Sequence, residues 1–130
     1  MDLKKRKKEH KKMSFNRFLV SFKYTYEGLK YAYLNEQSMR LHAIGSFIIF
    51  ILGLIIGLNM IEWFLILIVA TISVIAELLN TGIEATVDLI TKDIHPLAKI
   101  AKDCGSAAGG IAGIVYALIS TIIIISHLIG

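Results

Sequence analysis

The sequence predicts an all-α integral membrane protein with three transmembrane helices and an amino-terminal amphipathic surface helix. Hydrophobic residues make up 55% of its 130 residues, and the mean hydropathy is +0.67. These residues gather in three long runs, and about 20 apolar residues in a helix cross the hydrocarbon core of a bilayer. The runs predict spans at about residues 41–61, 63–83 and 106–129, within a single domain.

The positions of the charges predict the orientation of these spans. All 14 Lys and Arg residues lie before residue 41 or within residues 92–102. Because basic residues collect in cytoplasmic loops, the N-terminus and residues 84–103 are expected inside. The turn at residues 59–62 and the C-terminus are then extracytoplasmic. The basic segment before the first span is too long for a secretory signal peptide.

The segment before the first span divides into two parts. Residues 15–34 carry aromatic and aliphatic side chains at helical spacing with charges between them, which predicts an amphipathic helix on the inner membrane surface. Residues 1–13 form a basic tail that is expected to be disordered and attracted to anionic lipid headgroups. Nucleic acid is not expected as a partner for so short a tail beside a membrane domain. Residues 14–130 are expected to form the membrane domain.

The second span continues without proline into a stripe of polar residues. Glu77, Asn80, Glu84 and Asp88 share an arc of about 80° on one helix face. Glu77 lies about 22 Å along the helix from Glu62, inside the hydrocarbon or at its inner edge. An ionisable side chain there is energetically costly, so it is a functional candidate.

Two interpretations of this stripe remain open. Carboxylates so close together favour a cation, and their oxygens suit Mg²⁺, while Glu77 in apolar surroundings suits a general base for a lipid hydroxyl. Alternatively, the stripe pairs only with lysines of residues 92–102, and for Asp88 alone this second interpretation is preferred. Burial of Glu77 together with Asn80 and Glu84 favours the functional interpretation.

The start of the third span carries charged and small residues. Lys102 and Asp103 could meet phosphate and nucleotide, or form an ordinary charged collar. Small residues follow at four-residue spacing, which lets helices approach closely in lipid, and this face is expected to contribute to contacts between subunits. The sequence has neither the P-loop pattern nor a dinucleotide fingerprint, so any nucleotide site uses another device. One cysteine and four scattered histidines exclude a disulfide and disfavour a zinc site.

Two motifs resemble those of a known family. Residues 77–84 read ELLNTGIE and are followed by Asp88, and residues 101–108 read AKDCGSAA. This combination resembles the prokaryotic diacylglycerol kinase family, which includes the undecaprenol kinases of Gram-positive bacteria, and the resemblance covers about residues 14–130. It implies a homotrimer in the bacterial cytoplasmic membrane, with active sites at subunit interfaces. It also implies ATP as co-substrate, Mg²⁺ as cofactor and a membrane lipid alcohol as substrate.

The resemblance also implies roles for individual residues. Glu77 would be the catalytic base that contacts the lipid hydroxyl, Glu36 and Glu84 would hold Mg²⁺, and Asn80 would orient the site. Ser106 would line the lipid site. The implied nucleotide contacts are Lys102 and Asp103, with Arg17, Tyr24, Asp93 and His95 as weaker candidates because residues 92–96 match the family pattern poorly.

The lipid itself has two candidates. The glycine-rich third span and Asn35-Glu36 look more like the Gram-positive branch, which implies phosphorylation of undecaprenol to undecaprenyl phosphate. Conversion of diacylglycerol to phosphatidic acid is the alternative. A small membrane scaffold or transport subunit, with the polar stripe lining a path for ions, is the non-enzymatic alternative.

Overall fold

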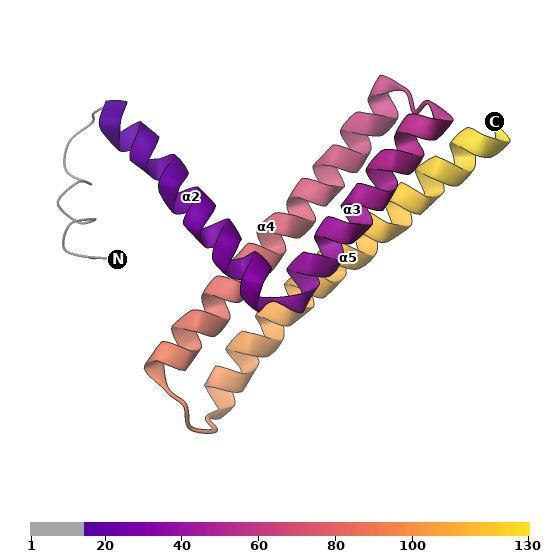
Figure 1. Cartoon of the computed structure of the whole chain (residues 1–130). Coiled ribbons are helices and arrows are strands. Elements are labelled where there is room, and N and C mark those ends of the chain that lie inside the picture. The colour runs from indigo at the N-terminus through magenta and orange to yellow at the C-terminus, as the bar shows by residue number, and fades with distance from the viewer. Residues whose placement is uncertain (1–14) are drawn as a thin grey trace. The chain divides into compact units, whose positions relative to one another are not determined.

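The computed structural model describes residues 15–130, and every regular element in that range is helical (Figure 1). The helices are α2 (Phe15–Asn35), α3 (Gln37–Ile56), α4 (Met60–Ile90) and α5 (Pro96–Ile129). This confirms the predicted fold class. The basic tail predicted at residues 1–13 lies outside the described residues.

The chain divides into two compact units, Met1–Tyr31 and Ala32–Gly130. In the first unit, α2 follows the predicted amphipathic pattern. Its aromatic face holds Phe15, Phe18 and Phe22, with ring centroids 6.4 Å and 5.1 Å apart along the series. Lys23 and Glu27 pair on the charged side at 4.0 Å. Spacings of three or four residues bring the members of each pair together on the surface of α2.

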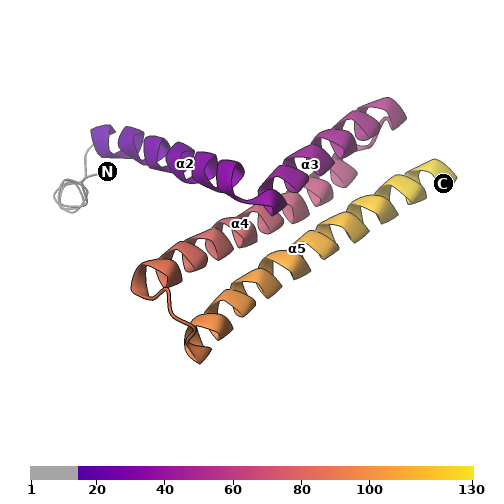
Figure 2. The ribbon, with the colours of Figure 1, turned by 60° about the horizontal axis from the view of Figure 1, so that its bottom comes forward.

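In the second unit, α3, α4 and α5 form an antiparallel bundle of three candidate membrane spans. Their most apolar windows have mean hydropathies of 2.1, 2.2 and 2.3. Few of their side chains are buried within the chain, as expected when apolar surface meets lipid instead of a protein core. α4 and α5 lie side by side and both extend past the start of α3, as Figures 1 and 2 show. That extension carries the polar end of the α4 stripe out of the most apolar region.

A tight turn at residues 57–59 joins α3 to α4, and residues 60–62, which were expected in the turn, form the start of α4. Gly57 adopts φ 77°, the left-handed conformation that glycine reaches without strain, and the Gly57 amide donates to the Gly53 carbonyl at 3.1 Å. Asn59 then caps α4, because its side-chain oxygen accepts from the Ile61 and Glu62 amides at 2.9 Å and 3.1 Å. The Glu62 carboxylate accepts from the Asn59 amide at 2.7 Å, which completes a capping box.

His127 in the last turn of α5 ties this end of the bundle together. Its Nδ1 lies 3.0 Å from Glu62 Oε2, and its Nε2 lies 3.1 Å from the Ile56 carbonyl oxygen. The three helix ends are therefore linked by one imidazole. Neither Glu62 nor His127 had been predicted to make this contact.

Replacing Asn59 with alanine should lower stability without altering catalysis. The substitution removes the oxygen that caps α4, and loss of such a cap costs about 1 kcal/mol. Thermal unfolding in mild detergent should show a lower midpoint for Asn59→Ala than for Asn59→Asp, which keeps a capping oxygen. Equal midpoints for the two variants would show that the cap contributes nothing.

Candidate active site

Glu77 occupies a narrow slot in the bundle. Its side chain projects from α4, and the residue is only 7% exposed. Ser38 Oγ of α3 donates to Glu77 Oε2 at 2.8 Å. On the other side lies the backbone of α5 at Gly109, where a Cβ would sit 2.8 Å from Glu77 Oε1. The carboxylate thus lies between a hydroxyl group and a helix surface that lacks a side chain, buried as the sequence predicted.

A polar ladder, made of Ser38, His42 and Ser46, runs along α3 above this slot. Ser38 reaches Glu77, as described, and His42 Nε2 lies 2.5 Å from Ser73 Oγ of α4. Ser46 Oγ lies 2.9 Å from the Tyr116 hydroxyl of α5, and the His42 ring stacks on the Tyr116 ring at 5.3 Å. Hydrogen bonds between helices in lipid are worth roughly 1 kcal/mol each, so the ladder fixes α3 against both neighbours.

The polar ladder was not recognised in the sequence. Its signal is present, because residues 38, 42 and 46 are polar at four-residue spacing at the start of an otherwise apolar span. Such spacing places side chains on one helix face. Polar residues on one face of a membrane helix usually point toward the bundle interior.

A cavity of about 430 Å³ opens beside Glu77 between α3 and α5. Its polar lining comes from Glu77, Ser38, His42 and Tyr116, and the rest of its wall is apolar or glycine. The volume lies within the range of small-molecule sites in proteins. A mostly apolar cavity with a carboxylate at one point suits a ligand that has a single polar group and an apolar body.

The polar stripe continues along α4 on the face that meets α5. Asn80 is 7% exposed, and its Nδ2 donates to Glu84 Oε1 at 3.4 Å. Within residues 15–130 the buried Oδ1 of Asn80 has no hydrogen-bond partner. A Cβ added to Gly105 would overlap this oxygen, so only glycine leaves room for it there. Buried amide oxygens are normally hydrogen-bonded, so an unpaired one is a candidate for contact with a ligand.

At the end of the stripe Asp88 forms an ion pair with a lysine, as predicted by the interpretation in which Asp88 has no catalytic role. Lys102 Nζ lies 2.6 Å from Asp88 Oδ1, and both side chains are substantially exposed. Lys99 pairs with Asp103 in the same region. Exposed ion pairs contribute little to stability, so these side chains can exchange partners at small cost.

A groove of about 300 Å³ lies at the loop between α4 and α5. It brings together five charged or titratable residues that the sequence analysis had singled out: Asp88, Asp93, His95, Lys102 and Asp103. The poorly matching loop residues therefore share a groove with the well-matching ones. The described charges include both cations and carboxylates, which is the composition expected of a site for a metal-bound polyphosphate.

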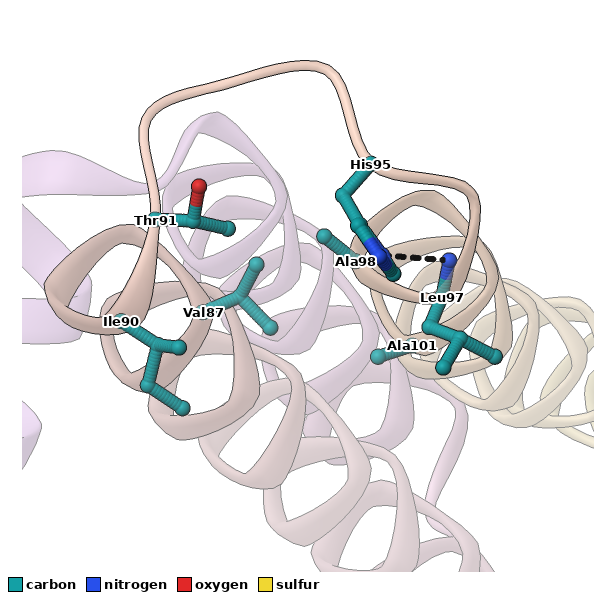
Figure 3. Close-up of a pocket in the computed structure, with 7 residues that line it drawn as sticks. All are labelled: Val87, Ile90, Thr91, His95, Leu97, Ala98 and Ala101. Atoms are coloured by element: carbon teal, nitrogen blue, oxygen red, sulfur yellow. Dashed lines mark hydrogen bonds between the residues drawn. The ribbon is translucent and has the colours of Figure 1, made fainter.

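The same loop fixes the start of α5. His95 precedes Pro96 and caps the helix, since its Nδ1 accepts from the Leu97 amide at 3.2 Å (Figure 3). Asp93 is held by its own amide, which donates to Thr91 Oγ1 at 3.0 Å. The amino-terminal end of α5, which begins at this loop, carries a partial positive charge that favours anions nearby. A second cavity of about 420 Å³ lies on the apolar side of the loop, lined by Val87, Ile90, Thr91, His95, Leu97, Ala98 and Ala101.

Two of the small residues of α5 allow a close approach within the chain itself. Gly105 and Gly109 are buried against Asn80 and Glu77 of the same chain. The close approach predicted from their spacing is therefore made within one subunit, and it serves the polar stripe. Ser106 and Gly110 lie on the exposed part of α5.

The remaining predicted site residues are spread along the chain. Glu36 precedes α3 at its N-cap position, and its side chain makes no capping hydrogen bond. Arg17 and Tyr24 lie on α2, in the amino-terminal unit. Within residues 15–130 no three His, Cys, Asp or Glu side chains gather as a metal site. Two carboxylates such as Glu36 and Glu84 still fit the chemistry of Mg²⁺, which often takes one or two carboxylates and completes its shell with phosphate and water.

Comparison with known proteins identifies the family. The sequence profile described as "Prokaryotic diacylglycerol kinase" matches residues 23–124. The undecaprenol kinase of Bacillus subtilis is 41% identical over 116 residues, which cover 89% of this chain and 90% of that protein. A diacylglycerol kinase of Helicobacter pylori is 36% identical over 84% of this chain and 85% of its own length. The diacylglycerol kinase of Escherichia coli K12 is 33% identical over 87% of this chain and 93% of its own. The chain belongs to the prokaryotic diacylglycerol kinase family and is a bacterial membrane lipid kinase.

Proposed function

We propose that this kinase transfers the γ-phosphoryl group of Mg·ATP to undecaprenol and forms undecaprenyl phosphate. The observation that carries the proposal is the Glu77 slot, in which a buried carboxylate faces an apolar cavity of about 430 Å³. The 41% identity to an undecaprenol kinase supports this alcohol. Diacylglycerol is the alternative substrate, in keeping with the names of other relatives.

In this proposal Glu77 is the catalytic base. The lipid hydroxyl enters the cavity and gives its proton to the carboxylate as its oxygen bonds to the γ-phosphorus. The bond from that phosphorus to the bridging oxygen of ADP breaks, and ADP leaves. Catalysis of phosphoryl transfer rests chiefly on positioning and charge neutralisation, which a held carboxylate and a nearby cation supply. Asn80 orients the site through its contact with Glu84.

Mg·ATP binds from the aqueous side of the same helices. Glu36 and Glu84 would hold Mg²⁺, and the ion would neutralise phosphate charge when bound. Lys102 leaves its exposed pair with Asp88 to contact phosphate, and Asp103 contacts the nucleotide. Asp93 and His95 share their groove and are proposed as further nucleotide contacts, as are Arg17 and Tyr24 from α2.

The proposal includes the arrangement of the protein in the membrane. The clustering of basic residues supports a cytoplasmic N-terminus and an extracytoplasmic C-terminus. The chain assembles as a homotrimer, and the large exposed apolar surface of its spans is available for contacts between subunits. Ser106 lines the lipid site. The mass of the detergent-solubilised protein, measured with light scattering, tests the trimer, and a monomeric mass would contradict it.

A competition assay tests the choice of lipid. Undecaprenol and diacylglycerol are offered in equal amounts in mixed micelles with γ-labelled ATP, with Mg²⁺ present or chelated. We expect at least about tenfold more label in undecaprenyl phosphate, since a difference of about 1.4 kcal/mol in transition-state binding gives a tenfold ratio. Label mainly in phosphatidic acid would retain the mechanism and make diacylglycerol the substrate.

A further inference from the structure

We infer that Ser38 is a positioning residue for the base Glu77. Its hydroxyl holds Oε2 of the carboxylate and thereby leaves Oε1 to accept the proton of the lipid alcohol. The inference rests on the proposed role of Glu77. It adds to that proposal a residue outside both family motifs, on a different helix from the base.

The contacts of the Glu77 carboxylate carry this inference. Ser38 Oγ donates to Oε2 at 2.8 Å, a hydrogen bond from α3 to the carboxylate on α4. Oε1 lies toward Gly109, and both Glu77 and Gly109 line the 430 Å³ cavity. The two oxygens are therefore inequivalent, because Oε2 is engaged by Ser38, and the residue that carries them lines the space in which a substrate hydroxyl fits.

A glutamate side chain is flexible and needs such restraint. It has several rotatable bonds, and holding a catalytic group in a reactive geometry contributes strongly to rate. In the slot, α5 limits the carboxylate by contact at Gly109, whereas Ser38 fixes its orientation by a directed hydrogen bond. Contact alone excludes positions but does not choose between the two oxygens.

The position of Ser38 in α3 also connects the base to the proposed metal site. Ser38 is the second residue of α3, directly after the N-cap turn that carries Glu36. A hydrogen bond from this turn to Glu77 keeps the beginning of α3 against α4. The proposed Mg²⁺ ligand Glu36 and the residue that holds the base, Ser38, thus lie two positions apart at the start of α3.

The polar ladder offers a matched control, because Ser46 makes the same kind of contact away from the base. Its hydroxyl pairs with Tyr116 at 2.9 Å, and like Ser38 it is a partly buried serine of α3. Ser46→Ala therefore removes one hydroxyl and one interhelical hydrogen bond without changing the slot. A merely structural role predicts the same result for both serines.

The test compares Ser38→Ala, Ser38→Thr and Ser46→Ala with the wild type, using purified protein and varying Mg·ATP and undecaprenol in turn up to saturation. Ser38→Ala should lower kcat about tenfold while the KM values stay within about twofold, because orientation of the base affects the chemical step. Ser38→Thr keeps the hydroxyl and should recover at least about half of the wild-type kcat. The unfolding midpoint of Ser38→Ala should match that of Ser46→Ala, whose kcat should be near wild type.

The outcomes separate this inference from the proposed function. If Ser38→Ala and Ser46→Ala have equal kcat while Glu77→Gln is inactive, Ser38 has no positioning role and Glu77 remains the base. A Ser38→Thr enzyme as slow as Ser38→Ala would equally overturn the role of the hydroxyl. An active Glu77→Gln enzyme would overturn the base assignment and the inference together. Should Ser38→Ala fail to fold, Ser38→Cys, which keeps the volume but donates weakly, replaces it in the comparison.

Discussion

Glu77→Gln is expected to lower turnover by at least about 10³-fold, within the range that a general base contributes. Glutamine has nearly the same shape, fits the slot and can still accept the hydrogen bond from Ser38, so the fold should be retained. It cannot take the proton of a lipid alcohol. Steady-state transfer of label from ATP to lipid measures the loss, and equilibrium dialysis with Mg·ATP should show nearly unchanged nucleotide binding.

Glu84→Gln provides the contrast to this variant. Glu84 lies seven residues after Glu77 on the same stripe, accepts a hydrogen bond from Asn80 and is a proposed Mg²⁺ ligand. Its substitution should weaken Mg·ATP binding and turnover together, whereas Glu77→Gln should affect turnover alone. A Glu77→Gln enzyme that keeps more than a small fraction of the wild-type rate would show that another group accepts the proton.

Gly109→Ala is expected to lower kcat by about 10²-fold with little effect on stability. The added Cβ would lie 2.8 Å from Glu77 Oε1 and 3.0 Å from its Cδ, so the carboxylate has to move. The fold should be retained, because the obstructed atoms are at the end of a flexible side chain that can rotate away. A shift of about 1 Å in a catalytic group can cost about 10²-fold in rate. Parallel measurements of kcat and of thermal unfolding test both parts of the prediction.

Gly82→Ala is the control, on the exposed side of α4. A Cβ at Gly82 would meet nothing within 4 Å, and Gly82 is not among the residues that line the cavity beside Glu77. Both substitutions replace a helical glycine by a better helix former, so the gain in helix propensity is common to the two variants. If Gly109→Ala were as active as Gly82→Ala, the tight fit of the slot would have no part in catalysis.

The regular features of the fold could be predicted from the sequence because each depends on local pattern. Run length identified the three spans, and helical spacing placed the amphipathic segment that became α2 (Phe15–Asn35). The acidic stripe was predictable because α4 has no break between its apolar part and Asp88. Pro96 is the first residue of α5, a position where its fixed φ and missing amide hydrogen suit the start of a helix.

The partners of the site residues could not be predicted, because they depend on the register between helices. Spacing alone shows that Gly105 and Gly109 share a face, but it does not say which helix they meet. The structure places them against Asn80 and Glu77, where contacts between subunits had been expected. The Ser38 contact with Glu77 joins residues 39 positions apart and follows only once α3 and α4 are aligned.

The central claim is that this chain is a Mg·ATP-dependent kinase of a lipid alcohol, and the stoichiometry of its reaction tests that claim most directly. Purified protein is reconstituted in vesicles whose sole lipid alcohol is undecaprenol, and ADP and lipid phosphate are measured together, the latter by mass spectrometry. We predict one undecaprenyl phosphate for each ADP, with both products lost when Mg²⁺ is chelated or when Glu77→Gln replaces the wild type. ADP formation without lipid phosphate, or no product from protein shown to be folded, would contradict it.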